Sequence, residues 1–248
     1  MSSPDMSTWL FDLGNSRLKC APVRDGRIGE AIAIDHDGTA FAPGWEQRLP
    51  ARFDDAIVAS VAASPLAVEL LDALTRRCAR ISLARTQAAF DGVRIAYAQP
   101  SRLGVDRFLA LLAAHARETR PALVVGIGTA LTIDLLDADG LHRGGRIAPS
   151  PALMRAALHA RAPQLPAEGG AWRAFASDTA DALASGCDGA ALGLIEGSLA
   201  AAAALLGEPP RLLLHGGGAT ALLPRLGDAV HAPALVLEGL ARWARTGG

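Results

Sequence analysis

Short apolar runs alternate with turn residues in the first part of the chain. The apolar runs cover residues 9–12, 18–23 and 28–34, and the breaks between them contain Gly14 with Asn15 and Asp25 with Gly26. Short apolar runs bounded by Gly, Asn and Asp are typical of β-strands joined by tight turns. The pattern therefore predicts an antiparallel three-stranded meander at the start of the chain.

The next elements alternate between strand and helix. Residues 56–62 form an apolar run rich in alanine and valine, and Pro65 then begins a segment with leucines at helical spacing. A second helix is expected from about Asp106 to a point before Pro121, because proline disfavours helix in the residue that precedes it. Strand followed by helix predicts an α/β layer packed on the meander.

The opening pattern then returns. Residues 122–126, 131–136 and 141–147 read as strands, with breaks at Gly128 and Asp139, and helices are expected at 151–160 and about 178–206. A last strand at 211–214 runs into three glycines, after which a helix follows. This weak internal duplication predicts an α/β fold of two actin-like (ribonuclease H-like) halves, residues 1–118 and 119–248, that flank a nucleotide cleft. A single doubly wound sheet is the alternative.

The composition argues against some classes of binding partner. The chain has 24 Lys and Arg residues against 25 Asp and Glu residues, so its net charge is −1. A nucleic-acid or anionic-membrane binder would usually have an excess of basic residues, and this chain has none. Uncharged runs reach about 13 residues, fewer than the roughly 20 that cross a bilayer. Residues 1–8 lack a secretory signal pattern, so we expect a cytoplasmic protein. Cys20, Cys78 and Cys187 have no disulfide or zinc spacing and are expected to be buried.

The first turn carries groups that suit a phosphate. Asp12 precedes Gly14, whose lack of a side chain lets the backbone approach a ligand, and Asn15 and Ser16 can donate hydrogen bonds. Asp12 can hold hydrated Mg²⁺, and Lys19, the only lysine, supplies a point charge. An ordinary hairpin turn remains the competing interpretation.

Two more glycine-rich turns follow strands. Residues 126–134 combine two glycines with the Thr129 and Thr132 hydroxyls and the Asp134 carboxylate. Gly216, Gly217 and Gly218 leave room for a flat ring or a phosphate before a helix. Three such turns, each directly after a strand, together favour a nucleotide site.

Between the halves, Asp106 and Arg107 stand at an expected helix start. The Asp106 carboxylate could take a proton from a hydroxyl, and the Arg107 guanidinium could bind a substrate carboxylate. Helix capping by Asp106 is the competing interpretation.

The chain resembles the type III pantothenate kinases, an actin-like, ATP-dependent family of bacterial coenzyme A synthesis. The resemblance rests on motifs that follow one another in order over nearly the whole chain: residues 12–16, 97–100, 103–107, 128–134, 144–149, 178–180, 185–186, 216–219 and 235–240. Three positions depart from the family pattern. Ser16 and Phe108 stand where threonine and tryptophan are usual, and Ser150 stands where glycine often follows Pro149.

The resemblance implies a kinase that phosphorylates pantothenate to 4′-phosphopantothenate, with ATP as the phosphoryl donor, Mg²⁺, and K⁺ or NH₄⁺ as a monovalent cation. It implies an ATP site made of Asp12, Leu13, Gly14, Asn15, Ser16, Lys19, Gly128, Thr129, Ala130, Thr132 and Gly217. Asp12 would hold Mg²⁺ through water, and Asp134 resembles the family position that binds the monovalent cation.

The resemblance also implies the acceptor site and its assembly. Asp106 would be the general base on the pantothenate hydroxyl, in a pocket lined by Tyr97, Gly104, Val105 and Arg107. Thr179 would reach this pocket from the partner subunit of a homodimer. The alternatives are a non-catalytic transcriptional accessory protein on the same fold, which loss of Asp106 or of the first turn would have favoured, and a sugar or acetate kinase, whose chains are generally longer.

Overall fold

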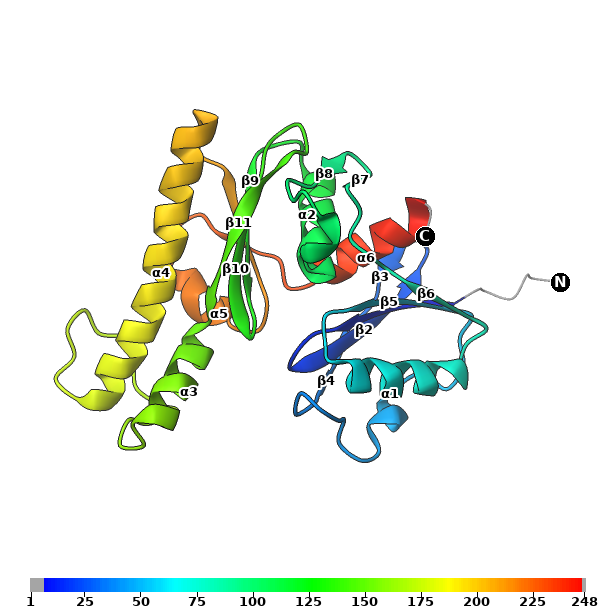
Figure 1. Cartoon of the computed structure of the whole chain (residues 1–248), viewed down its shortest axis with the longest axis horizontal. Coiled ribbons are helices and arrows are strands. Elements are labelled where there is room, and N and C mark those ends of the chain that lie inside the picture. Colours follow the sequence, from blue (N-terminus) through cyan, green and yellow to red (C-terminus); the bar gives the residue numbers. More distant parts are fainter. Residues whose placement is uncertain (1–6, 247–248) are drawn as a thin grey trace. The chain divides into compact units, whose positions relative to one another are not determined.

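The computed structural model describes residues 7–246, which fall into two compact units (Figure 1). Within the described part, unit 1 comprises residues 7–117 and 234–246, and unit 2 comprises residues 118–233. The sequence analysis placed residues 234–246 in the second half. They belong to unit 1 because the helix α6 (Leu235–Thr246) packs along the helix α2 (Val105–Arg117).

Unit 1 is built on a mixed sheet in the order β3-β2-β1-β5-β6, with β4 also paired to β2. Helix α1 (Ser64–Thr75) follows β5, and a short hairpin follows β6. The strands of the sheet and hairpin are β1 (Thr8–Leu13), β2 (Arg17–Arg24), β3 (Arg27–Ile28), β4 (Ile32–Asp35), β5 (Asp55–Ser60), β6 (Arg80–Leu83), β7 (Ala89–Phe90) and β8 (Val93–Arg94).

The predicted opening meander is present, with one difference. We expected a single strand over residues 28–34, and the structure divides this segment into β3 and β4. The pairing of β3 with β2 ends at Gly29, whose N–H donates to the Pro22 carbonyl over 2.8 Å. A Cβ at Gly29 would lie 2.9 Å from the Pro22 side chain, so glycine is required where the chain leaves the sheet.

The core of unit 1 lies between its sheet and α1. Phe11, Leu13 and Leu18 from the meander pack with Leu66 and Leu70 of α1, and all five are fully buried. Fully burying a side chain of this size contributes about 1.5–3 kcal/mol. This packing fixes the end of β1, where the first candidate turn begins.

Unit 2 repeats the same strand order. Its sheet runs β11-β10-β9-β12-β13, in which β9 pairs antiparallel with β10 and parallel with β12, as β1 pairs with β2 and β5. This repeated topology confirms the predicted duplicated α/β fold. The elements are β9 (Ala122–Ile127), β10 (Ala130–Leu136), β11 (His142–Pro149), β12 (Arg211–His215), β13 (Val230–His231), α3 (Pro151–Arg161), α4 (Thr179–Leu206) and α5 (Ala219–Leu222).

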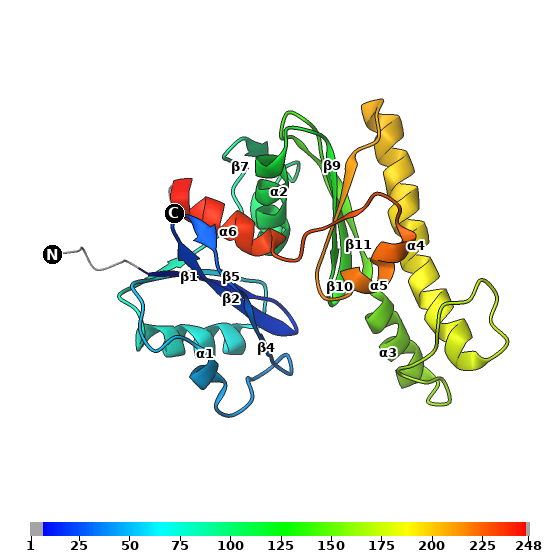
Figure 2. The ribbon, with the colours of Figure 1, turned by 180° about the vertical axis from the view of Figure 1, so that it is seen from behind.

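Helix α4 covers one face of the unit 2 sheet (Figure 2). Ala191, Leu192 and Ile195 of α4 are buried in one cluster with Val125 of β9 and Leu131 of β10. Within the described residues α4 alone is long and apolar enough to cross a membrane, whereas the sequence analysis found no such segment. Length and composition alone are weak evidence for a span, and the buried side of α4 packs on the sheet.

Gly239 sets the closest approach of α6 to α2. A Cβ at this position would lie 1.9 Å from the Leu109 carbonyl oxygen, well inside van der Waals contact. The two helix backbones therefore touch at a point that tolerates no side chain. Arg117 of α2 and Glu238 of α6 add an ion pair of 2.7 Å.

Substitution Gly239→Ala is expected to destabilise the protein by about 2 kcal/mol or more, because the added methyl group must push the helices apart. Thermal unfolding should then show a midpoint lowered by roughly 4–8 °C. The matched control is Glu238→Ala, which removes a half-exposed ion pair worth about 1 kcal/mol or less. Equal midpoints for Gly239→Ala and the wild type would show that this contact is not tight.

Candidate active site

The first candidate turn joins β1 to β2 in unit 1. The Gly14 N–H donates to the Arg17 carbonyl over 3.1 Å and closes the turn, which leaves Asn15 and Ser16 exposed at its tip. Asp12 and Lys19 lie directly opposite each other in the antiparallel ladder. The structure thus brings a carboxylate, an ammonium group and a loop with exposed donors together in one hairpin.

His36 supports this turn, and sequence reasoning missed it. Its Nε2 atom lies 3.0 Å from the Gly14 carbonyl oxygen, and its Nδ1 atom accepts from the Gly38 N–H over 3.1 Å. With Nδ1 as the acceptor, Nε2 carries the proton and donates to Gly14. No local spacing could reveal this contact, because it joins the turn to a loop beyond the meander.

Asp106 is the second residue of α2. Its Oδ1 atom accepts a hydrogen bond from the Arg107 N–H over 2.8 Å, so the carboxylate helps to satisfy the first turn of the helix. The capping interpretation is therefore correct in part, although Asp106 lies inside the helix. A Cβ at Gly104 would lie 2.5 Å from that Oδ1 atom, and Gly104 is thus the residue that leaves room for the carboxylate.

Asp12 and Asp106 repel each other. Burial is the main cause that raises the pKa of Asp12 to about 7, the Asp106 carboxylate raises it further, and Lys19 lowers it in part. A carboxyl group with this pKa carries part of a proton at neutral pH unless a cation stabilises its charged form. A cation bound beside Asp12 would lower this pKa and stabilise the charged carboxylate.

Arg107 is nearly buried, with 6% of its surface exposed. Its Nη1 atom donates to the Tyr97 hydroxyl over 3.3 Å, and its guanidinium carbon lies 5.9 Å from the Tyr97 ring centre. A buried guanidinium is suited to a carboxylate ligand, which can form two parallel hydrogen bonds with it. The structure thus brings Tyr97, Arg107 and Asp106 together at the start of α2.

A pocket of about 510 Å³ lies beside these residues in unit 1. It extends from the end of β1 past β5 and α1 to the residues just before α2. Its lining is mostly apolar and includes Leu13, Val61, Leu70, Leu103, Gly104 and Val105. The pocket can therefore take the carbon skeleton of a small molecule whose polar end faces Asp106.

The two other glycine turns meet in unit 2. The Gly128 N–H donates to the Ala130 carbonyl over 3.0 Å, and the Gly218 N–H donates to the Ile127 carbonyl over 2.9 Å. A Cβ at Gly216 would lie 2.4 Å from the Ile127 oxygen, so the two turns touch. The helix after Gly218 is only four residues long, which leaves the open glycine backbone as the feature suited to a ligand.

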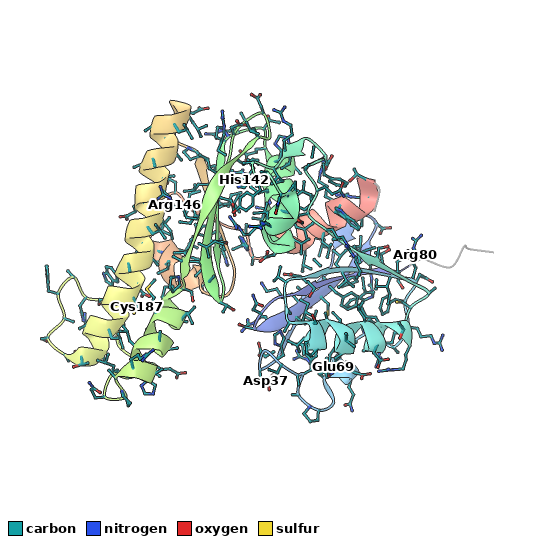
Figure 3. All side chains as sticks on the ribbon, in the orientation of Figure 1. Asp37, Glu69, Arg80, His142, Arg146 and Cys187 are labelled. Atoms are coloured by element: carbon teal, nitrogen blue, oxygen red, sulfur yellow. The ribbon has the colours of Figure 1, made fainter. Side chains whose placement is uncertain are left out.

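Asp134 is buried, with 2% exposed, and its Oδ1 atom accepts a hydrogen bond from His142 Nε2 over 2.9 Å. His142 lies on β11, on the same sheet, and is labelled in Figure 3. The ring N–H thus contacts one of the two carboxylate oxygens. In the described part of the chain, no three His, Cys, Asp or Glu side chains gather into a metal cluster. The role of Asp134 as a ligand of a monovalent cation stays a prediction.

Thr179 is the first residue of α4 and is exposed. The preceding residue, Asp178, caps the helix by accepting a hydrogen bond from the Asp181 N–H over 3.0 Å. Thr179 therefore lies at a fixed helix end in unit 2, and its contact with a partner subunit stays a prediction.

A family model for type III pantothenate kinase matches residues 9–201 of the chain. The type III pantothenate kinase of Stenotrophomonas maltophilia (strain K279a) is 60% identical over 239 residues, which cover 96% of this chain and 98% of the relative. The type III pantothenate kinase of Xylella fastidiosa (strain M23) is 55% identical over the same shares of both chains.

Solved structures agree on the fold. A Campylobacter jejuni protein described as a Baf family transcriptional activator has a TM-score of 0.64 at 20% identity and covers 96% of this chain and 97% of its own. An archaeal actin homologue has a TM-score of 0.53 at 10% identity, with 97% of this chain and 99% of its own covered. At these identities the likeness shows the actin-like fold alone, and it does not favour the accessory role.

The expected recognition, fold class and enzyme class are thus confirmed by independent comparisons. Nearly full-length identity of 55–60% to curated enzymes, together with a family model that spans most of the sequence, leaves one assignment. The chain belongs to the type III pantothenate kinase family.

Proposed function

We propose that this protein transfers the γ-phosphoryl group of ATP to the primary hydroxyl of pantothenate and forms 4′-phosphopantothenate, the first step of coenzyme A synthesis. The observation that carries this proposal is the corner of unit 1 in which Gly104 leaves room for the Asp106 carboxylate, while Arg107 and Tyr97 lie beside it. The 60% identical relative that is named for the same activity supports it.

Pantothenate is held by charge at one end and by apolar contacts along its skeleton. Arg107 binds the pantothenate carboxylate, with the Tyr97 hydroxyl beside the guanidinium. Val105 and the apolar pocket receive the carbon skeleton with its two methyl groups. The hydroxyl to be phosphorylated then lies at Asp106.

Asp106 accepts the proton of that hydroxyl. As the hydroxyl oxygen bonds to the γ-phosphorus, the bond from this phosphorus to the ADP oxygen breaks, and the proton passes to the Asp106 carboxylate. General base catalysis of this kind contributes about 10²–10⁴-fold to the rate. Positioning of the two reactants contributes the rest.

The ATP phosphates bind the turn of unit 1 that contains Leu13, Gly14, Asn15 and Ser16, and Lys19 contacts them as a point charge. The residues fit Mg²⁺ as well: Asp12 has a pKa of about 7 that a nearby divalent cation would lower, and it would hold the ion through water. When bound, Mg²⁺ neutralises part of the phosphate charge.

The turns of unit 2 take the rest of the nucleotide. Gly128, Thr129 and Ala130 form one side of this site, with Thr132 on the strand that follows them. Gly217 is exposed in the other turn. The monovalent cation implied by the resemblance would bind at the buried Asp134 carboxylate, whose Oδ1 atom accepts a hydrogen bond from His142.

We also propose a homodimer in which a second copy covers the apolar surface of unit 2. Phe175 is fully exposed, Ile147 is 65% exposed, and α3 has no buried residue in the single chain. Phe175 lies in the segment between α3 and Thr179. An apolar surface of this kind, next to a residue expected in a shared site, favours association with another copy of the chain.

Substitution Asp106→Asn should lower kcat by about 10²–10⁴-fold, because an amide does not accept the hydroxyl proton. Pantothenate affinity, measured by calorimetry, should stay within about threefold of the wild type. A variant that keeps most of its turnover would remove the role of Asp106 as the base.

Substitution Asp12→Asn should raise the unfolding midpoint at pH 8 in the absence of metal. The folded protein holds the Asp12 proton up to a pKa of about 7, against an ordinary value of 3.8, so stability is lost as the pH rises between these values. The gain from the substitution should be present at pH 8 and disappear near pH 4. Asp35→Asn is the charge-matched control, since Asp35 is exposed. A lower midpoint for Asp12→Asn at pH 8 would contradict the burial of an unfavourable charge.

Mixing Asp106→Asn protein with Thr179→Val protein should restore activity, if each site combines Asp106 of one subunit with Thr179 of its partner. Each heterodimer then has one wild-type site and one doubly substituted site, so recovery reaches at most half of the wild-type activity. Native mass spectrometry would verify that subunits exchange. An active monomer, or exchange without recovery, would rule out the shared site.

A further inference from the structure

Three neighbouring strands of unit 2 bring a hydroxyl and an imidazole together above a glycine. Gly126 on the central strand β9 pairs with Thr132 on β10 and with His215 on β12. Strand alternation puts these three residues on the sheet face opposite α4, since their neighbours Ile127, Leu131 and Leu214 belong to the core under that helix. Both side chains are half-buried.

Gly126 makes this convergence possible. A Cβ there would lie 2.7 Å from Thr132 Oγ1 and 2.9 Å from His215 Nε2. Both polar atoms therefore lie next to Gly126, one from each neighbouring strand, in the space that any other side chain would fill. The result is a compact pair of groups with hydrogen-bonding capacity.

The pair lies next to both glycine turns of the proposed ATP site. Gly126 stands two residues before Gly128 in one turn, and His215 directly precedes Gly216 in the other. The two turns touch through the Gly218 N–H and the Ile127 carbonyl. His215 and Thr132 thus lie at the end of the sheet where the two glycine turns of the proposed phosphate site meet.

The chemistry of this pair suits phosphate oxygens. An imidazole N–H and a threonine hydroxyl both donate hydrogen bonds, and donation to an anion is about twice as strong as to a neutral acceptor. The nearest carboxylate along the same face of β10 is Asp134, which accepts from His142.

We propose that His215, together with Thr132, contacts the β- or γ-phosphate of ATP and supplies a protein donor on the unit 2 side of the nucleotide. The inference rests on the proposed placement of ATP at the two glycine turns. Sequence reasoning assigned Thr132 to this site but missed His215, which only the register of β12 against β9 brings beside it.

The test compares nucleotides that differ in their phosphates. Binding of Mg²⁺ with AMPPNP, and of AMP, is measured by calorimetry for the wild type, His215→Leu, His215→Gln and Thr129→Ala. Glutamine keeps an N–H donor at a reach similar to that of Nε2, whereas leucine keeps the bulk and removes the donor. Thermal unfolding verifies that each variant is folded, and His215→Ala, which also lacks the donor, replaces the leucine variant if leucine does not fold.

His215→Leu should weaken AMPPNP binding by about tenfold or more and AMP binding by less than twofold, and His215→Gln should recover most of the loss. Equal weakening of both nucleotides would overturn the proposal, because a structural role moves both. If AMPPNP binding were unchanged in His215→Leu but weaker in Thr129→Ala, His215 would have no contact with the phosphates, and the proposed ATP site would stand without it. Unchanged binding in both variants would overturn the placement of ATP and this inference with it.

Discussion

Burial of the Asp12 carboxylate beside the like charge of Asp106 is the constraint on which the proposed catalytic part of unit 1 depends. The fold puts one carboxylate at the end of β1 and the other in the first turn of α2, and burial keeps water from screening them. Lys19 offsets only part of this cost, so the pKa of Asp12 remains near 7. A divalent cation bound beside the two carboxylates would relieve this repulsion, and its binding would then stabilise the folded chain.

Close backbone approach is the second requirement, and glycine meets it in both units. Gly104 gives Asp106 its position, Gly216 lets one turn touch Ile127, and Gly239 lets α6 lie against α2. Each contact would be lost with a single methyl group. Glycine therefore acts here in three separate ways: it positions a carboxylate, it joins two loops, and it brings the last helix back to unit 1.

Local patterns predicted much of this structure. The apolar runs and turn residues identified both meanders, and the order of motifs identified the first turn, Asp106 and the glycine cluster. What they missed depends on long-range pairing. The return of α6 to unit 1 depends on a contact between Gly239 and Leu109. The Asp134 carboxylate accepts a hydrogen bond from His142 across the β10–β11 ladder. His215 lies beside Thr132 only because of the register of two strand pairs. No periodicity in a single segment carries that information.

Hydrogen–deuterium exchange, measured with and without Mg²⁺ and AMPPNP, tests most directly the proposal that the turn after β1 and the glycine turns of unit 2 bind nucleotide. The account predicts slower exchange at the amides of residues 13–19 in unit 1 and of residues 126–132 and 215–218 in unit 2. Pantothenate added alone should slow exchange at residues 97–107 and leave the unit 2 turns unchanged. Absence of nucleotide protection at residues 13–19, or at both glycine turns of unit 2, would contradict the account.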